Sequence, residues 1–156
     1  MKYIVIFAAM LFVNLVYAQD SDSYIEQLKS ELKTSKKTIV SETMGLTDQQ
    51  AGVFWPLYGE FEKALDELNN ERIANIKDFA ANYDNLNDEK ADELTKKSFD
   101  FLGDRLALNE EYYNKFAEAL SPTVAAKFAQ LQHQIQLVGD ISIASNLPLV
   151  KKTEKK

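Results

Sequence analysis

The chain contains no cysteine, which excludes disulfide bonds and thiolate metal ligands. It has one histidine, His133, and Gln130 stands three residues before it, so neither a strong zinc site nor the Glu-x-x-His pairs of a di-iron bundle are expected. Glycine-rich phosphate loops, nucleophile elbows and Ser/His/Asp sets are also missing. We therefore expect a protein that is not an enzyme and holds no cofactor. A helical bundle that binds a metal or a haem, with Met44 and His133 as haem ligands, is the alternative.

Basic residues are outnumbered, because 18 Lys and Arg stand against 24 Asp and Glu and the net charge is −6. An acidic protein has little affinity for nucleic acid or for an anionic membrane surface, so neither is expected as a partner. Residues 151–156 are an exception, since they include four lysines and one glutamate. We interpret this short cationic run as a solvated end of the chain.

Long apolar runs are missing except near the N-terminus, where residues 4–16 are almost entirely apolar. This run is too short to span a membrane comfortably, and it follows Lys2 and leads to the small side chains of Val16 and Ala18. The pattern is typical of a secretory signal, so residues 1–18 are predicted to be a cleaved signal peptide. No stable membrane insertion is expected after cleavage. An uncleaved N-terminal anchor is the alternative.

Only five glycines and three prolines interrupt the chain, and apolar residues recur every three or four positions, which predicts an all-α fold. Residues 19–140 are expected to form one helical domain, followed by a tail over 141–156. A turn rich in Asn and Asp near residues 82–87 should join the second and third helices into a long central antiparallel hairpin. The fourth helix is expected to end at Gly139. The four helices are predicted over residues 24–44, 48–83, 88–120 and 122–139.

Ser23 and Asn87 are predicted to cap the first and third helices, and the other two helix starts have further local signals. Thr47 and Gln50 have the spacing of a capping box, in which each side chain bonds to the backbone N–H of the other residue. Gly45 just before them suits a left-handed end of the preceding helix, so a corner between two helices is predicted. Ser121 followed by Pro122 is expected to start the fourth helix.

A leucine directly precedes the predicted caps Thr47 and Ser121. Leu46, Thr47 and Gln50 match the pattern Leu-Thr-x-x-Gln fully, whereas Leu120 and Ser121 match it only in part. With these motifs the chain resembles the Spy/CpxP family of periplasmic helical proteins. The resemblance implies an extended or hook-shaped four-helix fold, a periplasmic location and a homodimer. It also implies an ATP-independent chaperone, or a regulator or sensor of envelope stress. In its acidity the chain departs from the family. Client binding through a positively charged face is therefore not expected here.

The predicted hairpin has an aromatic end, far from its turn. Counting back from the turn places Phe54 and Tyr58 opposite Phe116 and Tyr112. Rings at helical spacing are usually core, but a thin helical fold can leave them exposed as a binding surface, and both alternatives are open. The candidate residues for binding a client are Phe54, Trp55, Tyr58, Phe61, Arg72, Arg105, Tyr112, Tyr113 and Phe116.

The two arginines among these candidates lie on apolar stripes. Arg105 is expected near Leu65 and Asp66. The structural interpretation is a partly buried ion pair, or a side chain whose stem lies along apolar surface while its charged end reaches water. The functional interpretation of Arg72 and Arg105 is a polar contact on a client-binding face.

The third helix has two apolar seams side by side. Leu94 and Phe101 belong to one seam, and Phe99, Leu102 and Leu106 belong to the other. Such a broad apolar face should touch more than one neighbour.

These observations lead to one main hypothesis about function. We expect a non-enzymatic periplasmic protein that holds partly unfolded or stress-related envelope proteins on an amphipathic helical face. The alternative is a regulatory or sensor subunit that recognises one specific membrane-protein partner.

Overall fold

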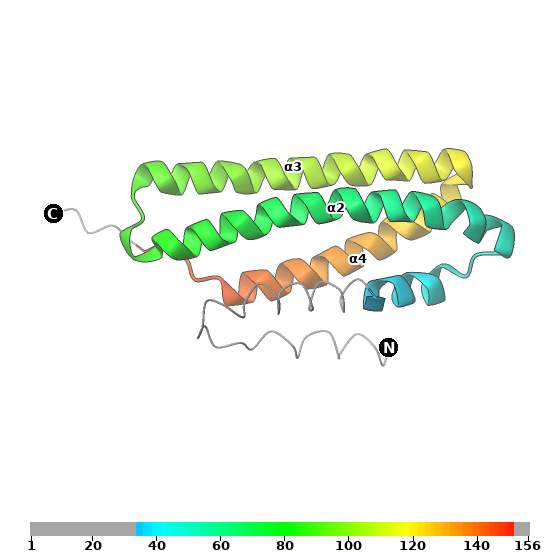
Figure 1. The fold of residues 1–156 in the computed structure, drawn as a ribbon, viewed down its shortest axis with the longest axis horizontal. Helices are drawn as coiled ribbons and strands as arrows, with labels where there is room; N and C mark the ends of the chain where they lie inside the picture. Colours follow the sequence, from blue (N-terminus) through cyan, green and yellow to red (C-terminus); the bar gives the residue numbers. More distant parts are fainter. Residues whose placement is uncertain (1–33, 152–156) are drawn as a thin grey trace. The chain divides into compact units, whose positions relative to one another are not determined.

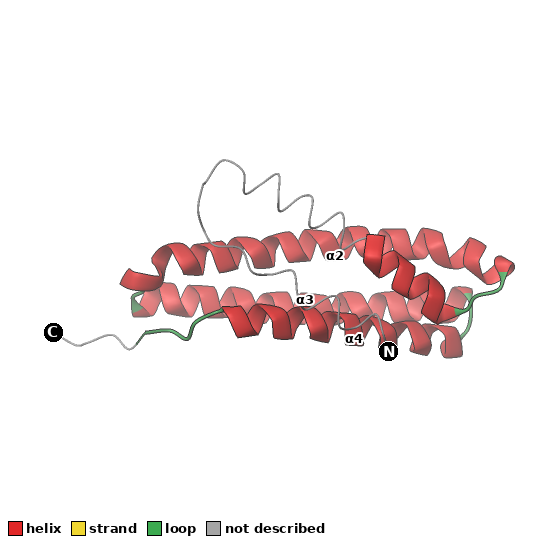
Figure 2. Cartoon of the chain, turned by 90° about the horizontal axis from the view of Figure 1, so that it is seen from below, coloured by secondary structure: helices red, strands yellow, loops and turns green. Residues whose placement is uncertain are grey.

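The computed structural model describes residues 34–151. This part of the chain is helical and contains no strand, which confirms the predicted all-α fold (Figures 1 and 2). The predicted signal peptide and the start of the first predicted helix lie outside the described residues. The elements in order are a helix over residues 34–44, α2 (Asp48–Asn82), the 3-10 turn η2 (Tyr83–Asn85), α3 (Asp88–Ala119) and α4 (Pro122–Asn146).

The described residues form two compact units. One unit contains residues 46–129 and 148–151, and the other contains residues 34–45 and 130–147. The first unit therefore holds α2, α3 and the opening turns of α4, and the candidate site lies within it.

The corner before α2 has the predicted capping box. The Thr47 N–H donates to Gln50 Oε1 at 3.0 Å, and the Gln50 N–H donates to Thr47 Oγ1 at 3.3 Å. Gly45 has a φ of 59°, a left-handed conformation that strains residues with a Cβ atom, and the preceding helix ends at Met44. A few local residues thus determine where one helix stops and the next begins.

The later helix starts are capped by side chains as well. Asn87 Oδ1 accepts the Lys90 N–H at 2.8 Å at the start of α3. Ser121 Oγ accepts the Val124 N–H at 3.2 Å, and Pro122 is the first residue of α4, as predicted.

The predicted end of the fourth helix at Gly139 is wrong, because α4 continues to Asn146. A glycine inside a helix costs only about 1 kcal/mol relative to alanine, which the rest of a long helix can offset. No proline follows until Pro148. The Asn146 side chain donates to the Ser142 carbonyl at 2.8 Å within the last turn. The predicted tail boundary at residue 140 therefore falls inside a helix.

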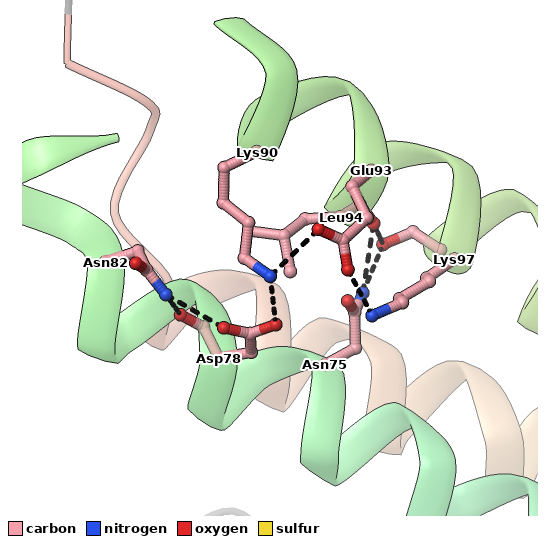
Figure 3. Close-up of polar contacts among 8 residues, drawn as sticks. Asn75, Asp78, Asn82, Lys90, Glu93, Leu94 and Lys97 are labelled. Atoms are coloured by element: carbon pink, nitrogen blue, oxygen red, sulfur yellow. Dashed lines mark hydrogen bonds and ion pairs between the residues drawn. The ribbon is translucent and has the colours of Figure 1, made fainter. Parts of the chain in front are cut away.

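Helices α2 and α3 lie side by side and antiparallel, as the short connection between them predicts (Figures 1 and 2). Figure 3 shows the polar contacts that join them near the turn. The Asn75 side-chain amide of α2 donates to the Leu94 carbonyl and to Ser98 Oγ of α3, each at 3.0 Å. Lys90 of α3 forms an ion pair with Asp78 of α2 at 2.7 Å. These contacts hold the register of the hairpin at its turn end.

Candidate functional site

The end of the hairpin far from its turn is filled by stacked rings. Phe54 of α2 stacks on Phe116 of α3 with 4.9 Å between ring centroids, as the predicted register requires. Phe128, in the opening turns of α4, meets Phe54 and Phe116 at 5.4 and 4.7 Å between centroids. Phe54 and Phe116 are completely buried, so this cluster is core.

Burial decides between the two alternatives for most of the predicted aromatic residues. Their exposed fractions lie between 0 and 6% for Phe54, Tyr58, Phe61, Tyr112 and Phe116. The core alternative therefore holds for these five side chains, which lie inside the hairpin and not on a client-binding surface. Trp55 and Tyr113 are half-buried and keep part of their surface.

The predicted ring pairing needs one adjustment. Tyr112 packs edge-on against Phe61, with 5.3 Å between centroids, one turn further along α2 than the predicted partner Tyr58. Tyr58 stacks instead beside Phe54 at 5.8 Å and also meets Phe128 at 5.9 Å. The central position of Phe128 was not predicted, because the packing of the opening turns of α4 on the hairpin has no local signal.

Tyr58 is one of the ionisable residues buried at this end, together with Tyr112 and Glu62. Burial, followed by the nearby carboxylate of Glu62, raises the pKa of the Tyr58 hydroxyl far above its usual value. The hydroxyl therefore stays neutral at any physiological pH. Tyr58 acts here as a core ring and not as an acid–base group.

The only two arginines of the chain meet on one ring. Arg72 of α2 and Arg105 of α3 place their guanidinium carbons 4.9 and 5.0 Å from the centroid of Phe101. Phe101 is only 7% exposed, and both arginines are half-buried. Cation–π contacts from both helices thus support the middle of the hairpin. Both arginines thus lie beside an apolar side chain of the hairpin, and the shared ring was not predicted. The predicted position of Arg105 near Leu65 and Asp66 stays a prediction.

A different part of α3 exposes large apolar side chains. Phe99, Leu102 and Leu106 are 66, 48 and 68% exposed. Gly103 lies among them, and a Cβ atom placed on Gly103 would meet nothing within 4 Å. These four residues, which we name the α3 stripe, are spaced i, i+3, i+4 and i+7. In helix pairs this spacing forms the hole that accepts a side chain from a facing helix.

The α3 stripe corresponds to the second predicted seam of the third helix. The first seam packs in the hairpin, where Leu94 and Phe101 are buried. The second seam is predicted to run on through Tyr113 to Phe116 and Leu120, and it is divided: Phe99, Leu102 and Leu106 are exposed, whereas Phe116 is completely buried. Tyr113 follows Leu106 by seven residues and so shares its face of α3. Among the predicted client-binding residues, Tyr113 is therefore the one that lies on the same face as the stripe. A second seam on a helix whose first seam already has a partner was the signal for the stripe.

Residues 34–151 also bear on the metal, haem and membrane alternatives. No group of three or more His, Asp or Glu side chains there is arranged to hold a metal ion. His133 is exposed, as predicted, and Met44 is buried. None of the described helices combines the length and apolar character needed to cross a membrane.

Comparisons with protein-family models, curated proteins and solved structures found no match to this chain. The resemblance to the Spy/CpxP family, carried by the corner at Leu46, Thr47 and Gln50, stays a prediction.

Proposed function

We propose that this protein is a non-enzymatic, ATP-independent chaperone-like protein of the periplasm. It holds partly unfolded or stress-related envelope proteins, and the α3 stripe is the surface that binds them. The observation that carries the proposal is the exposure of Phe99, Leu102 and Leu106 on one face of a long helix. Contiguous exposed apolar side chains of this kind mark interaction surfaces.

The size of the stripe favours weak and reversible binding. Complete burial of one such side chain contributes about 1.5–3 kcal/mol. Association costs offset much of the gain from three side chains, so a client can leave without nucleotide hydrolysis. A client with several apolar segments would rebind repeatedly, which slows its aggregation.

The hairpin supports this role because it presents the stripe on a preformed helix. The Phe54–Phe116 stack holds one end of α3, and the Asn75 and Lys90 contacts hold the other end. A binding surface that is already ordered loses little conformational entropy when a client binds.

Light scattering of a chemically denatured client, diluted into buffer with a several-fold excess of this protein, tests the proposal. The wild type should suppress aggregation, and the double variant Leu102→Ser/Leu106→Ser should lose most of that effect. Leu149→Ser is the matched control, because Leu149 is 90% exposed and lies outside the stripe. A wild type that does not suppress aggregation, or a double variant as active as the wild type, would count against the proposal. Capture of one specific envelope protein without general suppression would favour the regulatory alternative.

The proposal also includes a second copy of the chain as a partner. Size-exclusion chromatography with light scattering should give twice the mass of the protomer. A mass equal to one protomer at the concentrations of the aggregation assay would remove this part of the proposal.

A further inference from the structure

We propose that the α3 stripe selects helical amphipathic segments with lysine or arginine beside their apolar face. This inference rests on the proposed function and names the class of client that the same surface accepts. It is carried by the shape of the stripe and by the charges around it.

The shape of the stripe favours a helical client. Phe99, Leu102 and Leu106 each lie within about one turn of Gly103 on α3, and a Cβ atom placed on Gly103 would meet nothing within 4 Å, so the middle of the exposed face is open. Glycine is unfavourable inside a helix, and no neighbour in the described structure requires it at position 103. A missing Cβ lets a facing helix approach closely and insert one large apolar side chain into the hole.

The charge at the border of the stripe is negative. Asp100 is exposed and lies one turn before Gly103, so it flanks the stripe. Asp104 is exposed one turn after Asp100 and lies farther round the helix from the stripe. Glu110 is also exposed and lies one turn after Leu106, so it continues the line of the stripe.

Each basic residue of this part of α3 has a partner in the described structure. Lys96 and Lys97 form ion pairs with Asp92 and Glu93, the carboxylates one turn before them. The Arg105 guanidinium lies over the buried Phe101 ring. Lys96 lies one turn before Phe99, but its pair with Asp92 leaves no net charge there, so the net charge that a client meets beside the apolar surface is negative. Cationic segments are attracted to it, and acidic segments are repelled.

Two synthetic peptides test the selectivity. They share one amphipathic helical sequence with a central leucine, and they differ only in having lysine or glutamate beside the apolar face. Binding to the full-length protein is measured by fluorescence anisotropy at low salt and at 1 M NaCl. The lysine peptide should bind about tenfold more tightly at low salt, and the difference should shrink at high salt because exposed charges are screened.

Two sets of variants separate charge from shape. The triple variant Asp100→Asn/Asp104→Asn/Glu110→Gln should bring the two peptides close to equal affinity. A matched triple variant on α2, with the same change in net charge, should leave the preference intact. Gly103→Leu should weaken the binding of both peptides, because the leucine side chain fills the hole. Circular dichroism should show that its helix content is unchanged. The control substitutions on α2 are Glu60→Gln, Glu67→Gln and Glu71→Gln, all at exposed positions.

The outcomes distinguish this inference from the proposed function. If neither peptide binds, the proposed function fails together with the inference. If both peptides bind equally well at low salt, the charge selection is overturned and the proposed function stands. If Gly103→Leu binds both peptides as tightly as the wild type, the hole at Gly103 does not receive the client side chain.

Discussion

Phe116 and Phe99 lie on the same helix, and their environments are opposite. Phe116 is completely buried, whereas Phe99 is 66% exposed. The physical difference is in what faces each ring: Phe116 meets Phe54 from α2 and Phe128 from α4. Helical spacing therefore predicts which residues share a face, but the covering of that face depends on neighbours that are distant in the sequence.

In the proposed function the two regions have different roles. The buried rings make the hairpin rigid, and the α3 stripe is the surface proposed to bind a partner. The same side-chain chemistry stabilises the fold in one place and is available for binding in the other.

Truncating the two phenylalanines to alanine should give the largest difference in the free energy of unfolding. Phe116→Ala should lower the free energy of unfolding by about 3–5 kcal/mol, because it leaves a cavity in the ring cluster. Phe99→Ala should change it by less than about 1 kcal/mol, because Phe99 is mostly in water already. Urea unfolding followed by circular dichroism measures both values. Similar losses at the two positions would show that the stripe is part of a core.

Replacing glycine by alanine should change the free energy of unfolding in opposite directions at two positions. Gly45→Ala should destabilise the protein by about 1–2 kcal/mol, because the left-handed backbone there strains a residue with a Cβ atom. Gly103→Ala should stabilise it by about 0.5–1 kcal/mol, because alanine favours a helix and its Cβ would meet no neighbour. Thermal and urea unfolding of both variants check these signs. Destabilisation by Gly103→Ala would mean that the stripe is already covered in the folded protein.

Two threonines with different hydrogen bonds should also respond differently to substitution by alanine. Thr47→Ala should cost about 1 kcal/mol, because it removes the cap of α2 beside the aromatic end. Thr95→Ala should stabilise α3 by up to about 0.7 kcal/mol, because Thr95 is exposed inside a helix and its hydroxyl bonds only to the Ala91 carbonyl one turn back. Equal effects of the two substitutions would indicate that the capping box contributes little.

The smallest expected effect is a dependence on pH at the turn end of α3. Hydrogen bonds from Lys97 and then Lys90 lower the pKa of Glu93 to about 2, from a usual value of 4.5. Because the folded pKa is the lower one, this contribution to stability is present above pH 4.5 and is lost as the pH falls towards 2. Glu93→Gln should reduce the decline in the urea midpoint over that range, and salt should do the same by screening. An unchanged decline in Glu93→Gln would show that other carboxylates dominate.

Local features of the structure were predictable because the interactions that produce them lie within a few residues. The capping box at Thr47, the left-handed Gly45 and the start of α4 at Ser121 each depend on one helical turn or less. The turn between α2 and α3 is short, so the antiparallel hairpin and the pairing of Phe54 with Phe116 followed from counting residues. The end of α4 was missed because a single glycine shifts helix stability too little to stop it.

The amino-acid sequence by itself determined the helical class, the caps, the hairpin and the apolar faces, because spacing and side-chain chemistry specify them locally. Tertiary structure alone decided which faces are covered. It placed Phe128 among the rings and both arginines on Phe101, and it left Phe99, Leu102 and Leu106 in water. The reason is that burial depends on the helix that packs opposite a side chain, and no pattern within one helix specifies its neighbour.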